Sequence, residues 1–302
     1  MNLPNYFLAD LPPEATLSPT MIAEACQTLK RNREQYLANR STQILIDLLC
    51  EVAEGWLQTE NPFRKLALEL GPAETGFSSA TLARGLDSFF KRFTPENFSA
   101  LLLQEFGHGQ RLDKMISTGA EEKLNHAAMA LGPEFLVHIT AGNIPNPALT
   151  GIILGLLTRS AQFVKCASGS SFLPRLFAHS IYDADPKLGA CFEIASWRGG
   201  NVDLENALFA GADCVTATGS DETLDEIRKR LPLRTRFLGH GHRVSFGFAA
   251  QEVLHGSRGK KIVAAAADDV VAWNQLGCLS PHVIYVQLGG EISPEHFAQL
   301  LA

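Results

Sequence analysis

The sequence predicts an α/β protein with a doubly wound, mainly parallel sheet and a helical N-terminal region. From about residue 134, short apolar runs alternate with amphipathic segments, which is the pattern of successive β–α–β units. Residues 19–58 and 78–105 instead carry amphipathic helical patterns. The chain has 302 residues, 46% of them hydrophobic, so a large core can form.

The N-terminal third is expected to consist of helices. Residue Ser41 is a suitable N-cap for the second of them. The polar segment 108–119 is expected to cross the surface. The expected helices span residues 19–37, 41–58, 78–93 and 94–106.

The alternating region predicts which residues meet at a ligand site. In doubly wound sheets, ligands bind beyond the carboxyl ends of the strands. Asn143, Lys165, Gly219 and His242 each end or follow an expected strand. Strands are expected at 134–141, 161–168, 190–197 and 212–220, helices at 146–160, 171–185, 201–211 and 221–232, strand and loop at 234–249, a helix at 259–277, and a strand, a turn and a helix start at 282–302.

Composition narrows the functional classes. The net charge of −6 argues against a nucleic-acid partner, which would need a basic face. The six cysteines are far apart and form no CxxC pair, so no metal site is expected. The N-terminus has no signal-peptide pattern, and the longest apolar run, residues 151–157, is too short to span a membrane. A reduced, cytoplasmic location with free thiols is expected.

Two polar residues near strand ends are candidates for chemistry. Asn143 lies in ITAGNIPNPAL, where its amide could donate to a developing oxyanion, although for this segment alone a turn or helix cap is the better explanation. Lys165 ends the apolar run of FVKCASGS. It could contact a ribose or phosphate, or it could extend to solvent as an ordinary surface lysine.

Two further segments carry possible binding or base residues. In VTATGSDET, Thr218, Gly219 and Ser220 form a small-residue turn before a helix, which suits either phosphate binding or a plain N-cap. The loop GHGHRVSFG contains His240 and His242 between glycines. These two histidines are too few for a convincing metal site, and a base beside a thiol is the chemical alternative. No GxGxxG fingerprint follows a strand.

Cys278 is the candidate nucleophile. It lies in NQLGCLSPH, after Gly277 and before Pro281, where a helix would have to end. A cysteine at such a junction can have its thiolate favoured by the surroundings. The alternative is a small hydrophobic residue that fills the core.

In this order and spacing, these pieces resemble the aldehyde dehydrogenase superfamily. The segments HITAGNIPNPALTGIILGLLTRSAQFVKCASG, GHGHRVSF and WNQLGCLSPHVIYV are similar to its LuxC-type acyl-CoA reductase branch, the fatty-acid reductase of bacterial bioluminescence systems. The resemblance covers residues 130–290 well and the N-terminal third loosely. It implies an aldehyde-dehydrogenase-like fold.

The resemblance implies a role for each matched residue. Cys278 matches the catalytic thiol, and Asn143 matches the asparagine that holds the oxyanion together with the Cys278 backbone N–H. Lys165 matches the lysine that meets the cofactor ribose. The turn at residues 218–220 matches the Thr-Gly-Ser of the turn at the cofactor pyrophosphate and nicotinamide.

Two departures from the superfamily pattern are informative. Where most members have a general-base glutamate, this chain has His242, as the luminescence branch does, and His240 is a rival one register away. Many NAD-preferring members have a glutamate three residues after the lysine, and here Ser168 stands there. A serine does not repel the 2′-phosphate, so NADPH is the expected cofactor.

The implied function is NADPH-dependent reduction of a long-chain fatty acyl-CoA or acyl-protein thioester to the aldehyde. Residues 1–240 would form the cofactor domain and residues 241–302 would begin the catalytic domain. That domain is expected to be incomplete, since only 24 residues follow Cys278. A homo-oligomer or a complex with acyl-supplying proteins is expected.

Three alternatives to this function remain open. One is an NAD(P)-dependent dehydrogenase that oxidises an aldehyde. Another is a cofactor-free Cys–His acyltransferase or thioesterase, which the Lys165 and Thr-Gly-Ser segments disfavour. The last is an inactive truncated remnant of the reductase.

Overall fold

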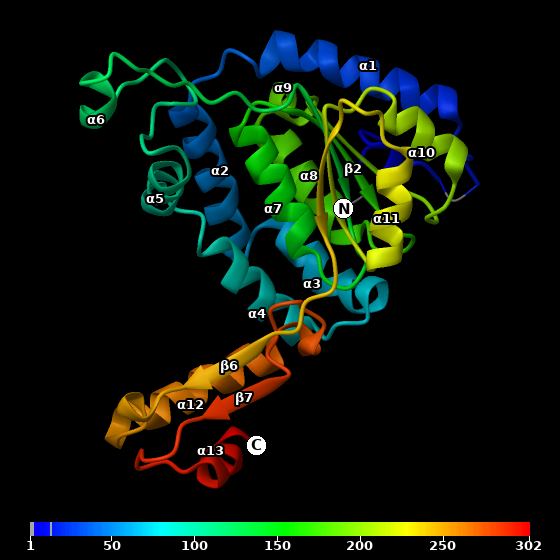
Figure 1. Ribbon diagram of the computed structural model, residues 1–302. Coiled ribbons are helices and arrows are strands. Elements are labelled where there is room, and N and C mark those ends of the chain that lie inside the picture. Colours follow the sequence, from blue (N-terminus) through cyan, green and yellow to red (C-terminus); the bar gives the residue numbers. More distant parts are fainter. Residues whose placement is uncertain (1–2, 13) are drawn as a thin grey trace.

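The computed structural model describes residues 3–12 and 14–302, and its centre is a five-stranded parallel sheet in the order β3-β2-β1-β4-β5 (Figure 1). Val137 of β1 pairs with Phe163 of β2 on one side and with Val215 of β4 on the other. The apolar runs form strands because both faces of this sheet are covered. The strands are β1 Phe135–Ile139, β2 Ala161–Cys166, β3 Phe192–Ser196, β4 Cys214–Thr218 and β5 Arg236–His240.

The strand order reverses between β1 and β4. The chain runs outward from β1 to β3 and then returns to the other side of β1, which creates a topological switch point there. The predicted doubly wound parallel sheet is therefore confirmed. The connecting helices are α7 Asn146–Leu157, α8 Phe172–Ala184, α9 Pro186–Gly189, α10 Val202–Phe209 and α11 Asp221–Arg230.

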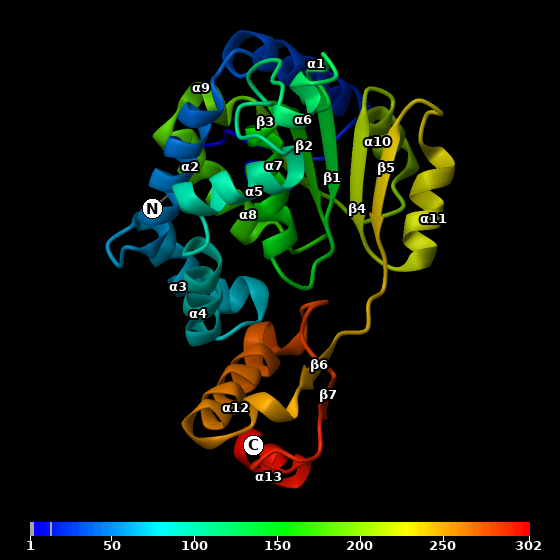
Figure 2. The ribbon, with the colours of Figure 1, turned by 60° about the vertical axis from the view of Figure 1, so that its left-hand side comes forward.

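The two faces of the sheet belong to two hydrophobic cores. On β2, Val164 and Cys166 point into the core shared with helices α2 to α4, α7 and α8, whereas Phe163 points into the core shared with α1 and α10. This alternation follows from the two-residue period of a strand. Figure 2 shows the two helical layers on opposite sides of the sheet.

The N-terminal region is helical, as predicted. Ser41 caps α2, since its Oγ accepts the N–H of Ile44 at 3.3 Å. Helices α3 and α6 were not predicted; in α3, Gly71 and Pro72 interrupt the pattern. The elements are η1 Leu8–Asp10, α1 Pro19–Tyr36, α2 Thr42–Leu57, α3 Pro62–Thr75, α4 Ser79–Phe90, α5 Pro95–Phe106 and α6 Gly119–Glu122.

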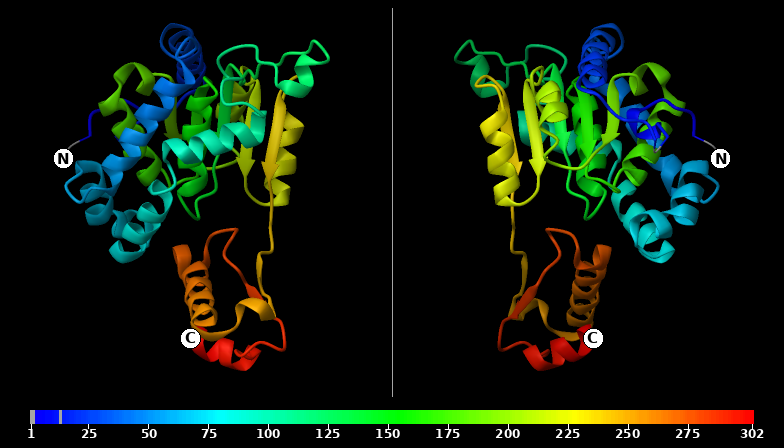
Figure 3. Two further views of the ribbon diagram at one scale, coloured as in Figure 1. Left: turned by 90° about the vertical axis from the view of Figure 1, so that its left-hand side faces the viewer. Right: turned by 90° about the vertical axis from the view of Figure 1, so that its right-hand side faces the viewer.

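A second, two-stranded parallel sheet lies beyond the carboxyl ends of the large sheet, at the end of the segment that follows β5 (Figure 3). It packs on its own small core, which includes Leu254, Val263 and Phe297. The predicted helix over 259–277 is wrong at its end, because α12 stops at Val271. The elements are β6 Phe246–Ala249, η2 Gln251–Val253, α12 Gly256–Val271, η3 Ala272–Gln275, β7 Val283–Val286 and α13 Pro294–Leu301.

Candidate active site

The predicted site residues of the large sheet gather at its carboxyl edge. Lys165 is the penultimate residue of β2, Thr218 ends β4, and Asn143 follows β1. The turn after β4 is tied to β5, because Gly219 donates its N–H to the carbonyl of His240 at 3.3 Å. Since all five strands are parallel, residues that are distant in sequence meet here.

The structure brings Asn143 to the loop that carries Cys278. The Asn143 Nδ2 donates to the carbonyl of Leu276 at 2.6 Å, two residues before the thiol. On the other side, Ser245 Oγ donates to the carbonyl of Cys278 itself at 2.6 Å. The Cys278 loop is therefore held by the segment that follows β1 and by the residue before β6.

Cys278 is the exposed member of the six cysteines, all of which are free thiols in the part of the chain that the structure describes. The other five are buried. Burial raises the pKa of the thiols of Cys26 and Cys166 to about 12, so these groups stay protonated at neutral pH. Among the six cysteines, Cys278 is therefore the thiol that reagents in solution can reach.

His242 lies near the start of α11. Its backbone N–H donates to the Asp221 carboxylate at 3.3 Å. A Cβ at position 241 would lie 2.1 Å from Asp221 Oδ1, so a larger residue there would displace that carboxylate. Across residues 3–12 and 14–302, no hydrogen bond joins the imidazole of His242 or His240 to the sulfur of Cys278. The structure brings the histidine loop to the same edge without a direct base–thiol contact.

Lys165 is buried, with 4% of its surface exposed, so it is not an ordinary surface lysine. Its Nζ lies 5.7 Å from the centre of the Trp197 ring. Burial lowers the pKa of Lys165, while the nearby Glu205 carboxylate raises it. Glu205 is itself paired with Arg230 at 2.5 Å. The Lys165 ammonium group therefore belongs to a partly buried cluster of charged side chains that also contains Glu205 and Arg230.

The remaining predicted cofactor residues lie on turns. Ser168 is exposed, two residues beyond β2 and next to Gly169 at φ +76°. Ser220 caps α11, accepting the N–H of Thr223 at 3.3 Å. Its neighbours in the first helical turn have backbone N–H groups without partners in the helix, as at any helix start. The sequence suggested this N-cap. The N–H groups of the first helical turn provide hydrogen-bond donors at the carboxyl edge of the sheet.

Sequence reasoning missed Asp221 and Ser245. Asp221 holds the backbone at His242, and Ser245 holds the Cys278 carbonyl. Both residues lie in segments in which other residues, such as Ser220 and His242, were the predicted candidates. An acid after a Ser cap and a serine in a loop are too common to mark a site, so only the long-range contacts reveal their roles.

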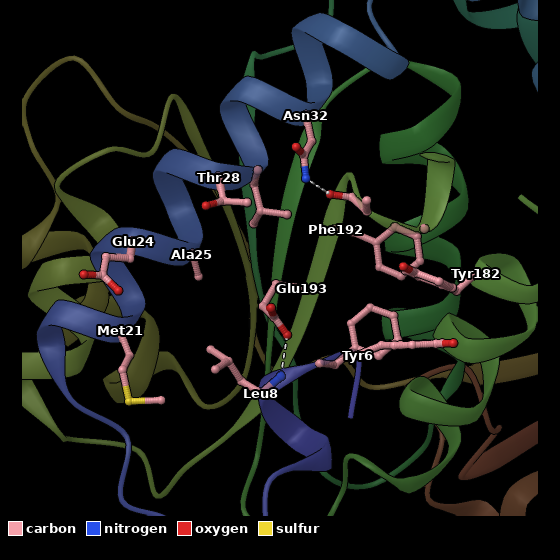
Figure 4. Close-up of a pocket in the computed structure, with 14 residues that line it drawn as sticks. Tyr6, Leu8, Met21, Glu24, Ala25, Thr28, Asn32, Tyr182, Phe192 and Glu193 are labelled. Atoms are coloured by element: carbon pink, nitrogen blue, oxygen red, sulfur yellow. Dashed lines mark hydrogen bonds between the residues drawn. The ribbon is translucent and has the colours of Figure 1, made fainter. Parts of the chain in front are cut away.

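A separate pocket of about 390 Å³ lies on the outer side of β3, against α1 and the segment before it (Figure 4). At its floor, Glu193 accepts the N–H of Leu8 at 2.7 Å. Burial raises the pKa of Glu193 to about 8. Neither Cys278 nor Asn143 lines this pocket, so it is not part of the edge site.

Comparison with known proteins identifies the family of the chain. The sequence model of the acyl-CoA reductase (LuxC) family matches residues 37–302.

The chain belongs to the LuxC acyl-CoA reductase family.

This LuxC-family chain is 28% identical over 153 residues to the long-chain acyl-protein thioester reductase of Vibrio harveyi, which covers 49% of the chain and 31% of that protein. The corresponding reductase of Photorhabdus luminescens is 26% identical over 152 residues, covering 49% of the chain and 31% of the relative. The aligned region is thus about a third of the length of these relatives. The resemblance that the sequence motifs predicted is confirmed.

Solved structures show the same fold. A salicylaldehyde dehydrogenase from Pseudomonas putida G7 superposes with a TM-score of 0.68 at 17% identity, over 95% of this chain and 56% of that one. The glyceraldehyde-3-phosphate dehydrogenase GapN of Methanocaldococcus jannaschii, solved with NADP, gives a TM-score of 0.62 at 15% identity, over 95% and 59%. The aldehyde-dehydrogenase-like fold is therefore confirmed.

Among the described residues, no group of three or more His, Cys, Asp or Glu side chains could hold a metal ion. None of the described helices is long and apolar enough to cross a membrane.

Proposed function

We propose that this LuxC-family chain carries the acyl-transfer and cofactor site of an NADPH-dependent reductase, which converts a long-chain fatty acyl thioester to the aldehyde. One observation carries the proposal: the exposed Cys278 loop is bonded to Asn143 at the carboxyl edge of a doubly wound sheet. The names of the relatives, long-chain acyl-protein thioester reductases, support the substrate class. The reaction is an oxidoreductase reaction that acts on a carbonyl.

The acyl-transfer step follows from the loop. The Cys278 thiolate attacks the thioester carbonyl carbon, and the carbonyl oxygen becomes an oxyanion. Asn143 keeps one amide hydrogen free beside its bond to Leu276, and the Cys278 N–H is the second donor. When the tetrahedral intermediate collapses, the carbon–sulfur bond to the substrate thiol breaks. The acyl group remains on Cys278, and the thiol leaves with a proton.

His242 is the proposed proton acceptor for the thiol. Its unperturbed pKa is near neutrality, which suits a group that takes and returns a proton. The segment from residue 239 to 247 contains three glycines and joins the two sheets. Because catalytic hydrogen bonds often tighten only when substrate is bound, the missing His242–Cys278 bond is compatible with this role. His240 stays the rival.

The edge offers hydrogen-bond donors to a nicotinamide cofactor, and the Asp221 and Glu222 carboxylates stand at the same helix start. The first turn of α11 offers backbone N–H groups, and the switch point lies beside them. Lys165 supplies a positive charge, and Thr218, Gly219 and Ser220 supply a small-residue surface. When bound, NADPH would supply the hydride that reduces the acyl group. Ser168, exposed and uncharged, leaves room for a 2′-phosphate, which supports NADPH over NADH.

We assign residues 1–240 to the NADP(H)-binding domain and residues 241–302 to the beginning of the catalytic domain. The separate core of the second sheet supports this division. The proposed substrates are acyl-CoA or an acylated partner protein, and a cytoplasmic location suits both. A homo-oligomer or a complex with acyl-supplying proteins would deliver the acyl group.

The decisive experiment is to label the chain with radioactive acyl-CoA and then map the label. We expect the label on Cys278, and its loss in Cys278→Ala, which should still bind NADPH. In His242→Ala, acylation should slow roughly hundredfold, the usual cost of losing a general base. His240→Ala is the matched control and should acylate at the normal rate.

Several results would contradict this proposal. Label on Cys166, with Cys278→Ala still active, would remove the nucleophile. Cleavage of acyl-CoA at full rate without NADPH would favour a cofactor-free acyltransferase. Oxidation of an aldehyde with NADP⁺ in the absence of coenzyme A, without the reverse reduction, would favour a dehydrogenase. Normal folding without nucleotide affinity would favour an inactive form.

A further inference from the structure

The backbone just before the Cys278 loop has an unusual conformation. Trp273, Asn274 and Gln275 have φ values of 50°, 52° and 61°, three successive residues in the left-handed region. Asparagine tolerates that region, but a bulky residue such as tryptophan rarely enters it. Such a turn persists only where the surrounding structure holds it.

Helix α4 of the N-terminal region supplies that hold. The Trp273 side chain is buried, and its ring lies directly on Gly85, where a Cβ would be 2.3 Å from Cζ2. Phe77 closes the edge of the indole, with the two ring centres 5.1 Å apart. Any side chain at position 85 would therefore displace the indole. Gly85 therefore provides the surface on which the Trp273 ring packs.

Trp273 is connected to the Cys278 loop by backbone hydrogen bonds. Its carbonyl accepts the N–H of Leu276 at 3.0 Å, and the Leu276 carbonyl accepts the amide of Asn143 at 2.6 Å. On the far side of the thiol, Ser280 donates its N–H to the carbonyl of Gly277 at 3.0 Å. Cys278 thus sits in a short loop, one end of which is fixed through Trp273.

We propose that Trp273 is a positioning residue for Cys278 and that Gly85 of α4 is the surface against which it is positioned. In this arrangement, a helix of the N-terminal region sets the distance between the thiol and Asn143, although it contributes no side chain to the site. The proposal rests on the proposed function only for what the positioned thiol does. It also accounts for a glycine in the middle of α4, where glycine is otherwise unfavourable.

The test is Gly85→Ala, with Gly119→Ala as the control. Gly119 is also in a helix, but a Cβ there meets no atom within 4 Å. The primary readout is the rate at which iodoacetamide alkylates Cys278, measured from pH 6 to pH 10. Because Cys278 is the exposed cysteine and the other five are buried, alkylation reports on this thiol.

We expect Gly85→Ala to change the alkylation rate several-fold and to move the midpoint of its pH profile, while Gly119→Ala matches the wild type. Tryptophan emission should shift in Gly85→Ala, because the added methyl group displaces the Trp273 indole from position 85. Acylation of Cys278 by acyl-CoA should fall by up to about a hundredfold, the cost of misplacing a reacting group by roughly 1 Å.

A second variant separates positioning from a loss of folding. Trp273→Phe removes Cζ2 and Cη2, two of the three indole atoms that lie within 2.7 Å of a Cβ at position 85, so alanine should be better tolerated there. We expect Gly85→Ala in the Trp273→Phe background to leave the alkylation profile of that background unchanged. Such coupling between residues in contact is what a double-mutant cycle measures.

The two proposals fail in different ways. If Gly85→Ala shifts the tryptophan emission but keeps the wild-type alkylation profile, Trp273 does not position the thiol. The same conclusion follows if Gly85→Ala is as harmful in the Trp273→Phe background as in the wild type. By contrast, a wild-type chain that is alkylated but never acylated by acyl-CoA would contradict the proposed function. The comparison of the Gly85 and Gly119 variants would remain valid in that case.

Discussion

His138 is an ionisable side chain sealed inside the large sheet. Its Nδ1 lies 2.7 Å from Thr216 Oγ1 on β4, and its Nε2 lies 3.0 Å from Gln162 Oε1 on β2. Since the Gln162 amide nitrogen donates to Ile152, its oxygen accepts, and Nε2 of the histidine must carry the proton. Burial lowers the pKa of His138 to about 4, although the bond to Gln162 raises it.

This histidine predicts how stability depends on pH. The unfolded chain binds a proton at His138 below about pH 6.5, whereas the folded chain does so only near pH 4. The stability that His138 contributes is therefore complete above pH 6.5 and is lost as the pH falls to 4. The loss should reach about 3 kcal/mol at pH 4. His138→Gln cannot titrate, so urea unfolding should show a smaller loss between pH 7 and pH 4.5.

Glu193 acts in the opposite direction, which is why the variant must be compared with the wild type. Its pKa is raised to about 8 by burial, so its contribution is complete below the unfolded pKa near 4.5 and is lost as the pH rises through 8. Because both proteins contain Glu193, its contribution to the pH dependence cancels when wild type and His138→Gln are compared. Equal pH dependence of the two proteins would contradict the histidine prediction.

At the scale of elements, glycines let helix α7 lie close to the sheet. A Cβ at Gly151 would be 3.0 Å from His138 Nδ1, and one at Gly155 would be 2.2 Å from Gln162 Oε1. The helix therefore rests on the polar side chains of β1 and β2. Because α7 leads directly from the Asn143 segment, its depth on the sheet helps to fix that segment.

Gly155→Ala should consequently destabilise the chain, although alanine is the better helix former by about 1 kcal/mol. The added methyl group has no room against Gln162, and overpacking of this kind costs about 1 to 3 kcal/mol. We expect a lower free energy of unfolding in urea. Gly119→Ala, with open space around it, should be neutral or slightly stabilising. A stabilised Gly155→Ala protein would mean that α7 can move away from the sheet freely.

At the scale of the whole molecule, the second sheet leaves one face uncovered. Phe246 and Phe248 of β6 are 65% and 66% exposed, and Tyr285 of β7 is 57% exposed. The ring centres of Phe246 and Tyr285 are 5.7 Å apart, so the face is continuous. The alternate residues of both strands pack against α12 and α13. We expect a two-stranded sheet with such an exposed apolar face to associate with another apolar surface.

We expect the folded 302-residue chain to bind a hydrophobic dye and to self-associate as its concentration rises. The double substitution Phe246→Thr and Phe248→Thr should reduce both, because threonine keeps strand preference and removes the rings. Leu233→Thr is the control, since Leu233 is fully exposed but lies outside both strands of this sheet. Dye fluorescence and sedimentation measure the effect. An equal reduction by the control would show that the face of β6 and β7 is not responsible.

The sequence by itself determined the parallel doubly wound sheet, most helices and the edge at which the predicted site residues lie. Periodicity reports which face of an element is buried, and the βαβ order puts strand ends such as Lys165 and Thr218 at one edge. The cap at Ser41 was also readable, because a helix start depends on neighbouring residues alone.

Only the tertiary structure decided how these parts meet. The helix before Cys278 stops at Val271, and Trp273 turns left-handed, because Gly85 lies far away in sequence but directly beneath the indole. Lys165 is buried rather than free in solvent for a similar reason, since α10 and Trp197 cover it. A local pattern encodes the period of an element but not the long-range contacts that end it, bury it or hold it under strain.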